Sequence, residues 1–274
     1  MENLNLILPE IFISLSIMFL LLLGVFKKNS SKLTHNLSLS VFLITTIITF
    51  NETFSVNRIT LFNESVVIDY MSSLMKIITL IAGFLVLVIS SNYLKIFKLF
   101  NIEYPILILS SVLGMMIMIS SNDLIVFYMG LELQSLGLYV LASYNRDQLK
   151  SSEAGLKYFV LSALSSGLLL YGCSLIYGFS GSTNFDVIAN QLNSSEYALT
   201  FGIVFILVGL AFKISAVPFH MWAPDVYEGS PTTVTLFFTM VPKIAALTVF
   251  IRFLYVPFLN IIDQWQMIII FLSI

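Results

Sequence analysis

The chain has 274 residues, of which 58% are apolar or aromatic and only 10% are charged, and its mean hydropathy is +0.96. An ordinary soluble domain carries about 25% charged residues, so the composition excludes a water-soluble globular protein and predicts an integral membrane protein. The net charge of -2, without a basic cluster, excludes a nucleic-acid partner, because phosphate binding needs stripes of Lys and Arg.

Apolar runs bounded by charged residues, Asn, Gly or Pro predict eight complete membrane helices, because about 20 residues cross about 30 Å of hydrocarbon. A ninth helix is predicted to begin near Trp265 and is too short at Ile274 to span a bilayer, so a further C-terminal part is expected. The fold class is an all-α polytopic membrane bundle, divided into an N-terminal three-helix region (1–104), helices four to eight (105–260) and the start of the ninth helix (261–274). The predicted spans are 6–26, 37–54, 72–92, 105–121, 123–143, 154–178, 198–217 and 232–253.

The loop cations predict the orientation of the bundle. Seven of them follow the odd-numbered helices one, three and five, whereas Arg58 alone follows an even-numbered one. Because cytoplasmic loops carry the excess of Lys and Arg, the N-terminus is predicted to lie outside, in the periplasm or the intermembrane space. The seven cations are Lys27, Lys28, Lys32, Lys95, Lys98, Arg146 and Lys150.

Ionisable residues near the middle of predicted helices carry the strongest functional signal, since a charge at the bilayer centre costs about 2.5–3.5 kcal/mol on insertion scales. Glu132 lies in helix five, Lys213 in helix seven and Lys243 in helix eight, at matched depth, which predicts one buried polar layer. One interpretation is a structural ion pair between Glu132 and Lys213, with Lys243 bound to backbone carbonyls. The other is proton transport, which we favour because buried ion pairs contribute little net stability. Separating the carboxylate from the ammonium would release a proton.

Two prolines lie beside the buried lysines. Pro218 lacks an N–H and clashes with the carbonyl of Ile214, next to Lys213, so the seventh helix is predicted to be discontinuous there. Pro242 is expected to free a carbonyl in the same way beside Lys243. Transporters place ion sites at such breaks, although prolines are also common as simple kinks of membrane helices.

The segment 218–231 is polar, aromatic and rich in turn residues, as in a re-entrant or connecting segment. His220 could relay protons, or could be an ordinary hydrogen-bonded residue. Asp225 and Glu228 could collect protons, or simply be solvated. Glu153 and Lys157 stand four residues apart, a spacing that pairs them at the start of helix six, although Lys157 could also contribute to the polar layer.

Other polar residues have simpler interpretations. Lys76 and Arg252 lie near helix ends and are predicted to snorkel towards water. Small residues of helix six, among them Ser162, are predicted to let another helix approach closely. Asp123 is predicted to cap helix five. Cys173, His35 and His220 cannot form a disulfide, an iron–sulfur site or a tetrahedral zinc site, so no metal is expected on this chain.

Four segments together resemble the antiporter-like membrane subunits of respiratory complex I, the NADH:quinone oxidoreductase. Within that family they are more similar to the subunit N group, called subunit 2 in mitochondria, than to its L or M relatives. The resemblance covers most of 105–260. The segments are Gly130-Leu-Glu-Leu-Gln-Ser-Leu, Ser152-Glu-Ala-Gly-Leu-Lys-Tyr-Phe, Phe212-Lys-Ile-Ser-Ala-Val-Pro-Phe-His-Met-Trp and Pro224-Asp-Val-Tyr-Glu-Gly-Ser-Pro.

The resemblance implies a proton half-channel built from helices four to eight, in which Glu132 pairs with Lys213 and Lys243 passes the proton onward, with His220 and Lys157 as further relay candidates. It also implies a second, inverted helical repeat, which this sequence does not include. No cofactor is expected on this chain, because NADH, FMN, iron–sulfur clusters and quinone would be bound by partner subunits of the complex.

The partners implied are the other membrane subunits of complex I and the lipid bilayer, in a bacterial plasma membrane or a mitochondrial inner membrane. Two alternatives remain. One is a subunit of a multi-subunit cation/proton antiporter, and the other is a structural membrane subunit that translocates nothing.

Overall fold

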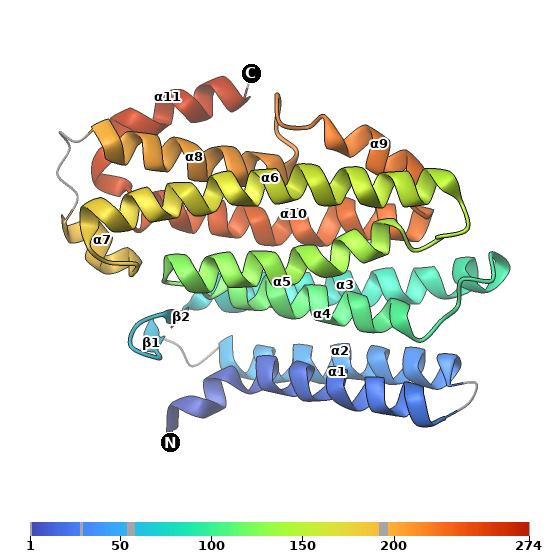
Figure 1. The fold of residues 1–274 in the computed structure, drawn as a ribbon. Coiled ribbons are helices and arrows are strands. Elements are labelled where there is room, and N and C mark those ends of the chain that lie inside the picture. The colour runs from blue at the N-terminus through green and yellow to red at the C-terminus, as the bar shows by residue number, and fades with distance from the viewer. Residues whose placement is uncertain (1, 28–29, 54–57, 192–196, 274) are drawn as a thin grey trace.

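The computed structural model describes residues 2–27, 30–53, 58–191 and 197–273 (Figure 1). Lys28, one of the cations used for the predicted orientation, lies outside these residues. Long helices lie side by side, and their connections gather at the two ends of the bundle. The helices are α1 (Leu8–Phe26), α2 (Ser31–Thr53), α3 (Tyr70–Ile96), α4 (Glu103–Ile119), α5 (Leu124–Ala142), α6 (Leu149–Ser180), α7 (Phe185–Gln191), α8 (Tyr197–Ile214), α9 (Trp222–Gly229), α10 (Thr232–Tyr255) and α11 (Ile262–Ser273).

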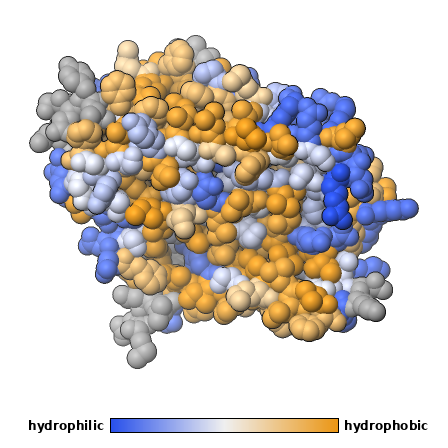
Figure 2. Space-filling view, viewed as in Figure 1, coloured by the Kyte–Doolittle hydropathy of each residue, from blue (hydrophilic) through white to orange (hydrophobic). Residues whose placement is uncertain are grey.

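The predicted all-α membrane bundle is confirmed. Six of the described helices are long and apolar enough to cross a membrane. Three shorter apolar helices accompany them, namely α4, the part of α8 from Leu199 to Ile214, and Leu259–Ser273, which contains α11. Each predicted span corresponds to one of these nine helices, so that predicted helices seven and eight are α8 and α10. Apolar residues cover most of the visible face, while hydrophilic residues gather towards its ends (Figure 2). The chain is a multi-pass membrane protein.

Short elements between the long helices were not predicted. A two-stranded antiparallel hairpin, β1 (Ile59–Leu61) with β2 (Val66–Ile68), joins α2 to α3. The helix α7 lies between α6 and α8, outside every predicted span. Strands of three residues are too short to show an alternating pattern, and a helix of two turns too short to show a helical one.

The helix α5 lies at the centre of the bundle. In its most apolar 18-residue window 56% of residues are buried, compared with 17% in α1. Its backbone touches that of α4, because a Cβ atom added to Gly114 would lie 2.5 Å from the amide nitrogen of Gln134. Such contact between backbones is possible only where both helices carry small residues. It fixes the position of α5, and with it the position of Glu132.

The two prolines behave differently. The helix α8 ends at Ile214, four residues before Pro218, as expected from the clash of the proline ring with that carbonyl. Ser215 then adopts a left-handed conformation with φ of 64°, and the chain turns before α9 begins at Trp222. The helix α10, in contrast, continues through Pro242 to Tyr255. That the seventh membrane helix is discontinuous stays a prediction.

Lys76 and Arg252 do not snorkel, and that prediction is wrong. Lys76 is 4% exposed, and its Nζ lies 2.6 Å from Oε1 of Glu10 on α1. Arg252 is also 4% exposed and lies 2.8 Å from Oδ1 of Asp69, the residue that caps α3. Burial would raise the pKa of Asp69, but Arg252 and hydrogen bonds from Ser72 bring it below its usual value. Neighbouring helices therefore cover both cations.

Candidate functional site

Lys213, in the last turn of α8, is the most completely buried lysine of the central helices. The residue is 6% exposed. Its Nζ donates hydrogen bonds to the Oγ atoms of Ser135 on α5, at 2.7 Å, and Ser162 on α6, at 2.6 Å. The Tyr139 hydroxyl also donates to Ser162, at 2.7 Å, and its ring centroid lies 5.9 Å from the Lys213 Nζ. Two helices, α5 and α6, thus bring hydroxyl groups to an amine carried by a third, α8.

Glu132 lies one helical turn before Ser135, on the same face of α5. The direct ion pair that the resemblance implies is not formed, since no ion pair joins the two side chains in the part of the chain that the structure describes. The buried Oε1 of Glu132 also has no hydrogen-bond partner among the described residues. The hydrogen bonds of the Lys213 amine therefore go to hydroxyl groups and not to the Glu132 carboxylate.

Lys243 of α10 binds the end of α8. Its Nζ donates to the backbone carbonyl of Lys213 at 3.1 Å and to the Ser215 hydroxyl. The last carbonyls of a helix have no partner within the helix, and a cation there is favoured by the helix dipole. The two lysines are therefore linked directly, because the Lys243 amine binds the backbone carbonyl of Lys213. This contact also matches the structural interpretation given above.

An aromatic cluster covers the same end of α8. The indole N–H of Trp222 donates to the carbonyl of Phe212 at 3.0 Å. Its ring stacks on Tyr158, with centroids 4.6 Å apart and an interplanar angle of 13°, and on Phe212 at 5.5 Å. The Lys243 Nζ lies 5.1 Å from the Trp222 ring, which is within range of a cation–π interaction. These rings keep the end of α8 in an apolar setting.

Lys157 and His220 lie apart from this buried group. Lys157 pairs with Glu153 at 2.8 Å, which confirms the predicted helix-end pair, and with Asp225 of α9 at 2.7 Å, and its side chain is 40% exposed. Glu228 pairs with Lys150 at 3.0 Å. These contacts tie α9 to the start of α6. His220 is exposed, and its ring makes no hydrogen bond to any residue that the structure describes.

The hydroxyl partners of Lys213 were missed in the sequence. Ser135 and Tyr139 follow Glu132 by three and seven residues, which places all three on one face of α5, and that spacing could have indicated them. Ser162 was interpreted only as a packing residue, and it does lie where α6 packs along α8. Its second role, as the shared acceptor for Lys213 and Tyr139, depends on contacts between helices that no local pattern reveals.

A polar cluster closes the opposite end of α5. Asp123 caps that helix, as predicted, by accepting from the amide of Ile125 at 2.7 Å. Close to it, Arg58 pairs with Asp186 of α7 at 2.6 Å, and the Asn122 side chain donates to the same carboxylate at 2.9 Å. Burial would raise the pKa of Asp186, but Arg58 and Asn122 lower it below its usual value. No group of three His, Cys, Asp or Glu side chains suited to a metal ion occurs among the described residues.

The sequence of this chain matches a known protein family and known relatives. Residues 121–274 match the family model described as NADH:quinone oxidoreductase/Mrp antiporter, TM. NADH-quinone oxidoreductase subunit N of Pelagibacter ubique is 77% identical over 274 residues, which are 100% of this chain and 58% of that protein. The protein of the same name from Rhodospirillum rubrum is 51% identical over 272 residues, which are 97% of this chain and 56% of that protein. The chain thus spans little more than half of these relatives.

Solved structures share the fold. A chain of respiratory complex I from Thermus thermophilus with bound aureothin superposes with a TM-score of 0.78 at 27% identity, covering 89% of this chain and 52% of that one. A chain of the Mrp complex from Dietzia sp. superposes with a TM-score of 0.77 at 21% identity, covering 92% of this chain and 49% of that one. The second likeness is one of fold alone.

Proposed function

The chain belongs to the NADH:quinone oxidoreductase/Mrp antiporter transmembrane family, and on this premise we propose that it is a proton-translocating membrane subunit of an NADH:quinone oxidoreductase, respiratory complex I. The observation that carries the proposal is the Lys213 amine, which is buried among hydroxyl groups and forms no ion pair with any carboxylate that the structure describes. A buried charge without a direct counter-ion adds no stability that explains its presence.

The hydroxyl groups suit a lysine that changes its charge. Ser135 donates to the Leu131 carbonyl at 2.6 Å and accepts from Lys213, while Ser162 accepts from both Lys213 and Tyr139. A hydroxyl group can donate or accept by rotating about one bond, so the layer can stabilise an ammonium or a neutral amine without moving its helices. Lys213 would hold the proton, and Glu132 would set how strongly it is held.

The energies involved are of the right size. At an effective dielectric of about 20, two charges about 4 to 8 Å apart interact by about 2 to 4 kcal/mol. Moving one charge through a potential of 100 mV changes its free energy by about 2.3 kcal/mol. A change in the distance or charge of Glu132 would therefore be enough to drive a proton from Lys213 against a membrane potential. Lys243, bound to the Lys213 carbonyl, would sense the same change and pass the proton onward.

The proposed function implies partner subunits and a membrane location. NADH, FMN, iron–sulfur clusters and quinone would be bound by other subunits, with which this chain would assemble in a bacterial plasma membrane, its N-terminus outside. Lys157 and His220, which lie away from the buried layer, would be outer relays at most. The relatives from Pelagibacter ubique and Rhodospirillum rubrum are bacterial proteins, and this supports the bacterial location.

The test is Lys213→Ala in the full-length subunit, within the assembled complex. We expect NADH-driven proton uptake by inverted membrane vesicles to be lost, while a native gel shows the complex assembled and NADH oxidation by an artificial electron acceptor continues. Lys98→Ala removes an exposed lysine from the turn before α4 and serves as the control. Loss of assembly without a specific loss of proton uptake would instead support a structural subunit.

A second candidate is a subunit of a multi-subunit cation/proton antiporter, because the family description covers Mrp antiporters as well. That function needs the same buried charges but no quinone reductase. Proton movement driven by a sodium gradient in vesicles without NADH, abolished by Lys213→Ala, would favour it over complex I.

A further inference from the structure

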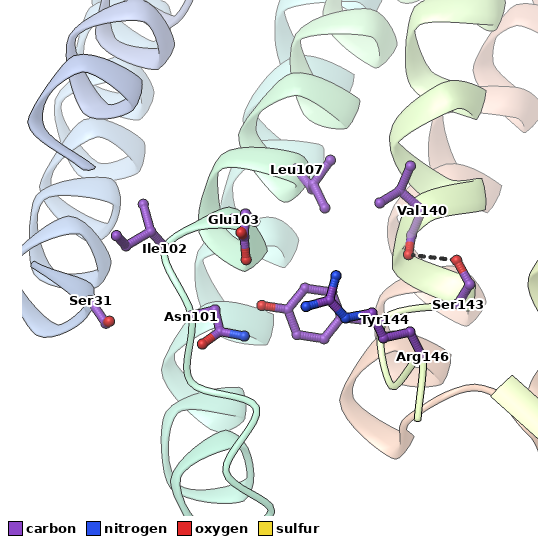
Figure 3. A pocket seen from close by; sticks show the side chains of 9 residues that line it. All are labelled: Ser31, Asn101, Ile102, Glu103, Leu107, Val140, Ser143, Tyr144 and Arg146. Atoms are coloured by element: carbon purple, nitrogen blue, oxygen red, sulfur yellow. Dashed lines mark hydrogen bonds between the residues drawn. The ribbon is translucent and has the colours of Figure 1, made fainter. Parts of the chain in front are cut away.

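A cavity of about 620 Å³ opens at the end of the bundle where α2 and α4 begin and α5 ends. Polar side chains and Ile102 lie near the helix ends, and the apolar Leu107 and Val140 lie further along the helices (Figure 3). Asn101, Glu103, Tyr144 and Arg146 form the polar part, and Leu107 and Val140 belong to the apolar part. This order, polar at the helix ends and apolar along them, is the order of a phospholipid at a membrane surface.

The cavity holds two opposite charges that do not neutralise each other. Glu103 and Arg146 both line it, yet neither side chain forms an ion pair in the part of the chain that the structure describes. Elsewhere at this end of the bundle opposite charges meet directly, as Lys150 and Glu228 do at 3.0 Å. A cavity flanked by a separate acid and a separate base is complementary to a ligand that itself carries both charges.

A buried hydrogen-bond donor lies on the side of the acid, because the Tyr144 hydroxyl points towards Asn101 and Glu103 (Figure 3). The buried Tyr144 hydroxyl has no partner among the described residues. Burial raises the pKa of this hydroxyl, with a further contribution from Glu103, so the group stays a neutral donor. The Arg146 guanidinium, which also lines the cavity, suits the oxygens of a phosphate group, because its N–H groups match them in geometry.

We propose that this cavity binds the headgroup of an aminophospholipid, phosphatidylethanolamine, with its phosphate at Arg146 and its ammonium at Glu103, beside the Tyr144 hydroxyl. The acyl chains would follow Leu107 and Val140 along the bundle, where Val140 is 51% exposed. Ethanolamine differs from choline in having N–H groups, so only ethanolamine can donate hydrogen bonds to the Glu103 carboxylate. An anionic glycerol headgroup would leave Glu103 without a positive partner. This site is independent of the proposed proton transfer.

The test uses the purified full-length subunit in its complex, with a photoactivatable phosphatidylethanolamine as probe and unlabelled lipids as competitors. We expect label on peptides that contain residues 101–107 or 140–146, and we expect unlabelled phosphatidylethanolamine to compete at about tenfold lower concentration than phosphatidylcholine or phosphatidylglycerol. A tenfold ratio corresponds to about 1.4 kcal/mol.

Variants then test the roles of Arg146 and Glu103 one at a time. Arg146→Gln should lower labelling about tenfold, whereas Lys98→Gln, which removes a positive charge from the same end of the bundle outside the cavity, should not. Glu103→Gln should remove the preference for ethanolamine over choline. Asp147→Asn, which changes an exposed acid next to Arg146, should keep it. Equal competition by all three lipids with the unmodified chain, or best competition by phosphatidylglycerol, would overturn the proposal even if a variant failed to fold.

Discussion

Two regions of the chain bury opposite charges, and they arrange them in opposite ways. In the N-terminal helices Lys76 of α3 contacts Glu10 of α1 at 2.6 Å, with the two side chains 6% and 11% exposed. In the central helices Lys213 is as deeply buried, but it contacts the hydroxyls of Ser135 and Ser162, while a carboxylate oxygen of Glu132 has no partner among the described residues.

The difference separates a structural role from a functional one. A direct ion pair is already neutralised, and it joins α1 to α3 in one geometry. Changing the charge of either member would leave the other buried and unpaired, which is costly. The Lys213 amine is stabilised by groups that can donate or accept, so its charge can change at a smaller cost. We therefore expect the same substitution to have different consequences in the two regions.

Lys213→Met should give the largest functional effect. It keeps the length and the burial of the side chain but removes the proton, so proton uptake by vesicles should fall at least about 100-fold, a loss comparable to removing a group worth about 3 kcal/mol in the rate. The thermal unfolding midpoint of the complex should change little, because no ion pair is broken. Near-normal proton uptake by this variant would contradict the functional interpretation of the central layer.

Lys76→Met should give the largest effect on stability. It leaves the Glu10 carboxylate buried without its partner, and removing one member of a buried pair costs about 3–5 kcal/mol of unfolding free energy. Proton uptake per assembled complex should stay unchanged. The double variant Glu10→Leu with Lys76→Met should recover most of the stability, since it leaves no buried charge. A loss of proton uptake in that stable double variant would show that the N-terminal pair takes part in transport.

Ser162→Ala should have an intermediate effect. The substitution removes the acceptor shared by Lys213 and Tyr139, and an unsatisfied buried donor costs about 1–3 kcal/mol. If the hydroxyl layer holds the proton, uptake should slow about tenfold, whereas Ser166→Ala, one turn further along α6, should leave it unchanged. Equal rates for both serine variants would mean that Ser162 only fills space between α6 and α8.

These comparisons also show what the sequence could predict. Glu132, Lys213 and Lys243 stand out because an ionisable residue in an apolar run is rare, and the structure places all three in or beside the interior of the bundle. The contacts of Lys213 come from α5 and α6, which are brought together by tertiary packing, so its partners could not be read from its own helix. Lys76 and Arg252 were misjudged for a similar reason, because hydropathy does not tell whether a residue near a helix end faces lipid or a neighbouring helix.

The smallest expected effect concerns the pair that lies outside both buried regions. Arg58 and Asp186 meet at 2.6 Å, but their side chains are 49% and 33% exposed, so solvent screening limits the pair to less than about 1 kcal/mol. The pKa of Asp186 is below its usual value in the folded chain. Its contribution is therefore fully present above the unfolded value, about 3.9, and is lost as the pH falls through the lower folded value.

Asp186→Asn tests this, with the unfolding midpoint measured between pH 6 and pH 2. The variant should be slightly less stable than the unmodified chain at pH 6, and the difference should shrink towards zero in acid, because the protonated Asp186 has lost the same charge. Asn cannot pair with Arg58 at any pH, and the hydrogen bond from Asn122 can still reach its side-chain oxygen. A difference that persists unchanged at pH 2 would assign the effect to packing at the start of α7 and would leave the buried charges as the groups whose pairing matters.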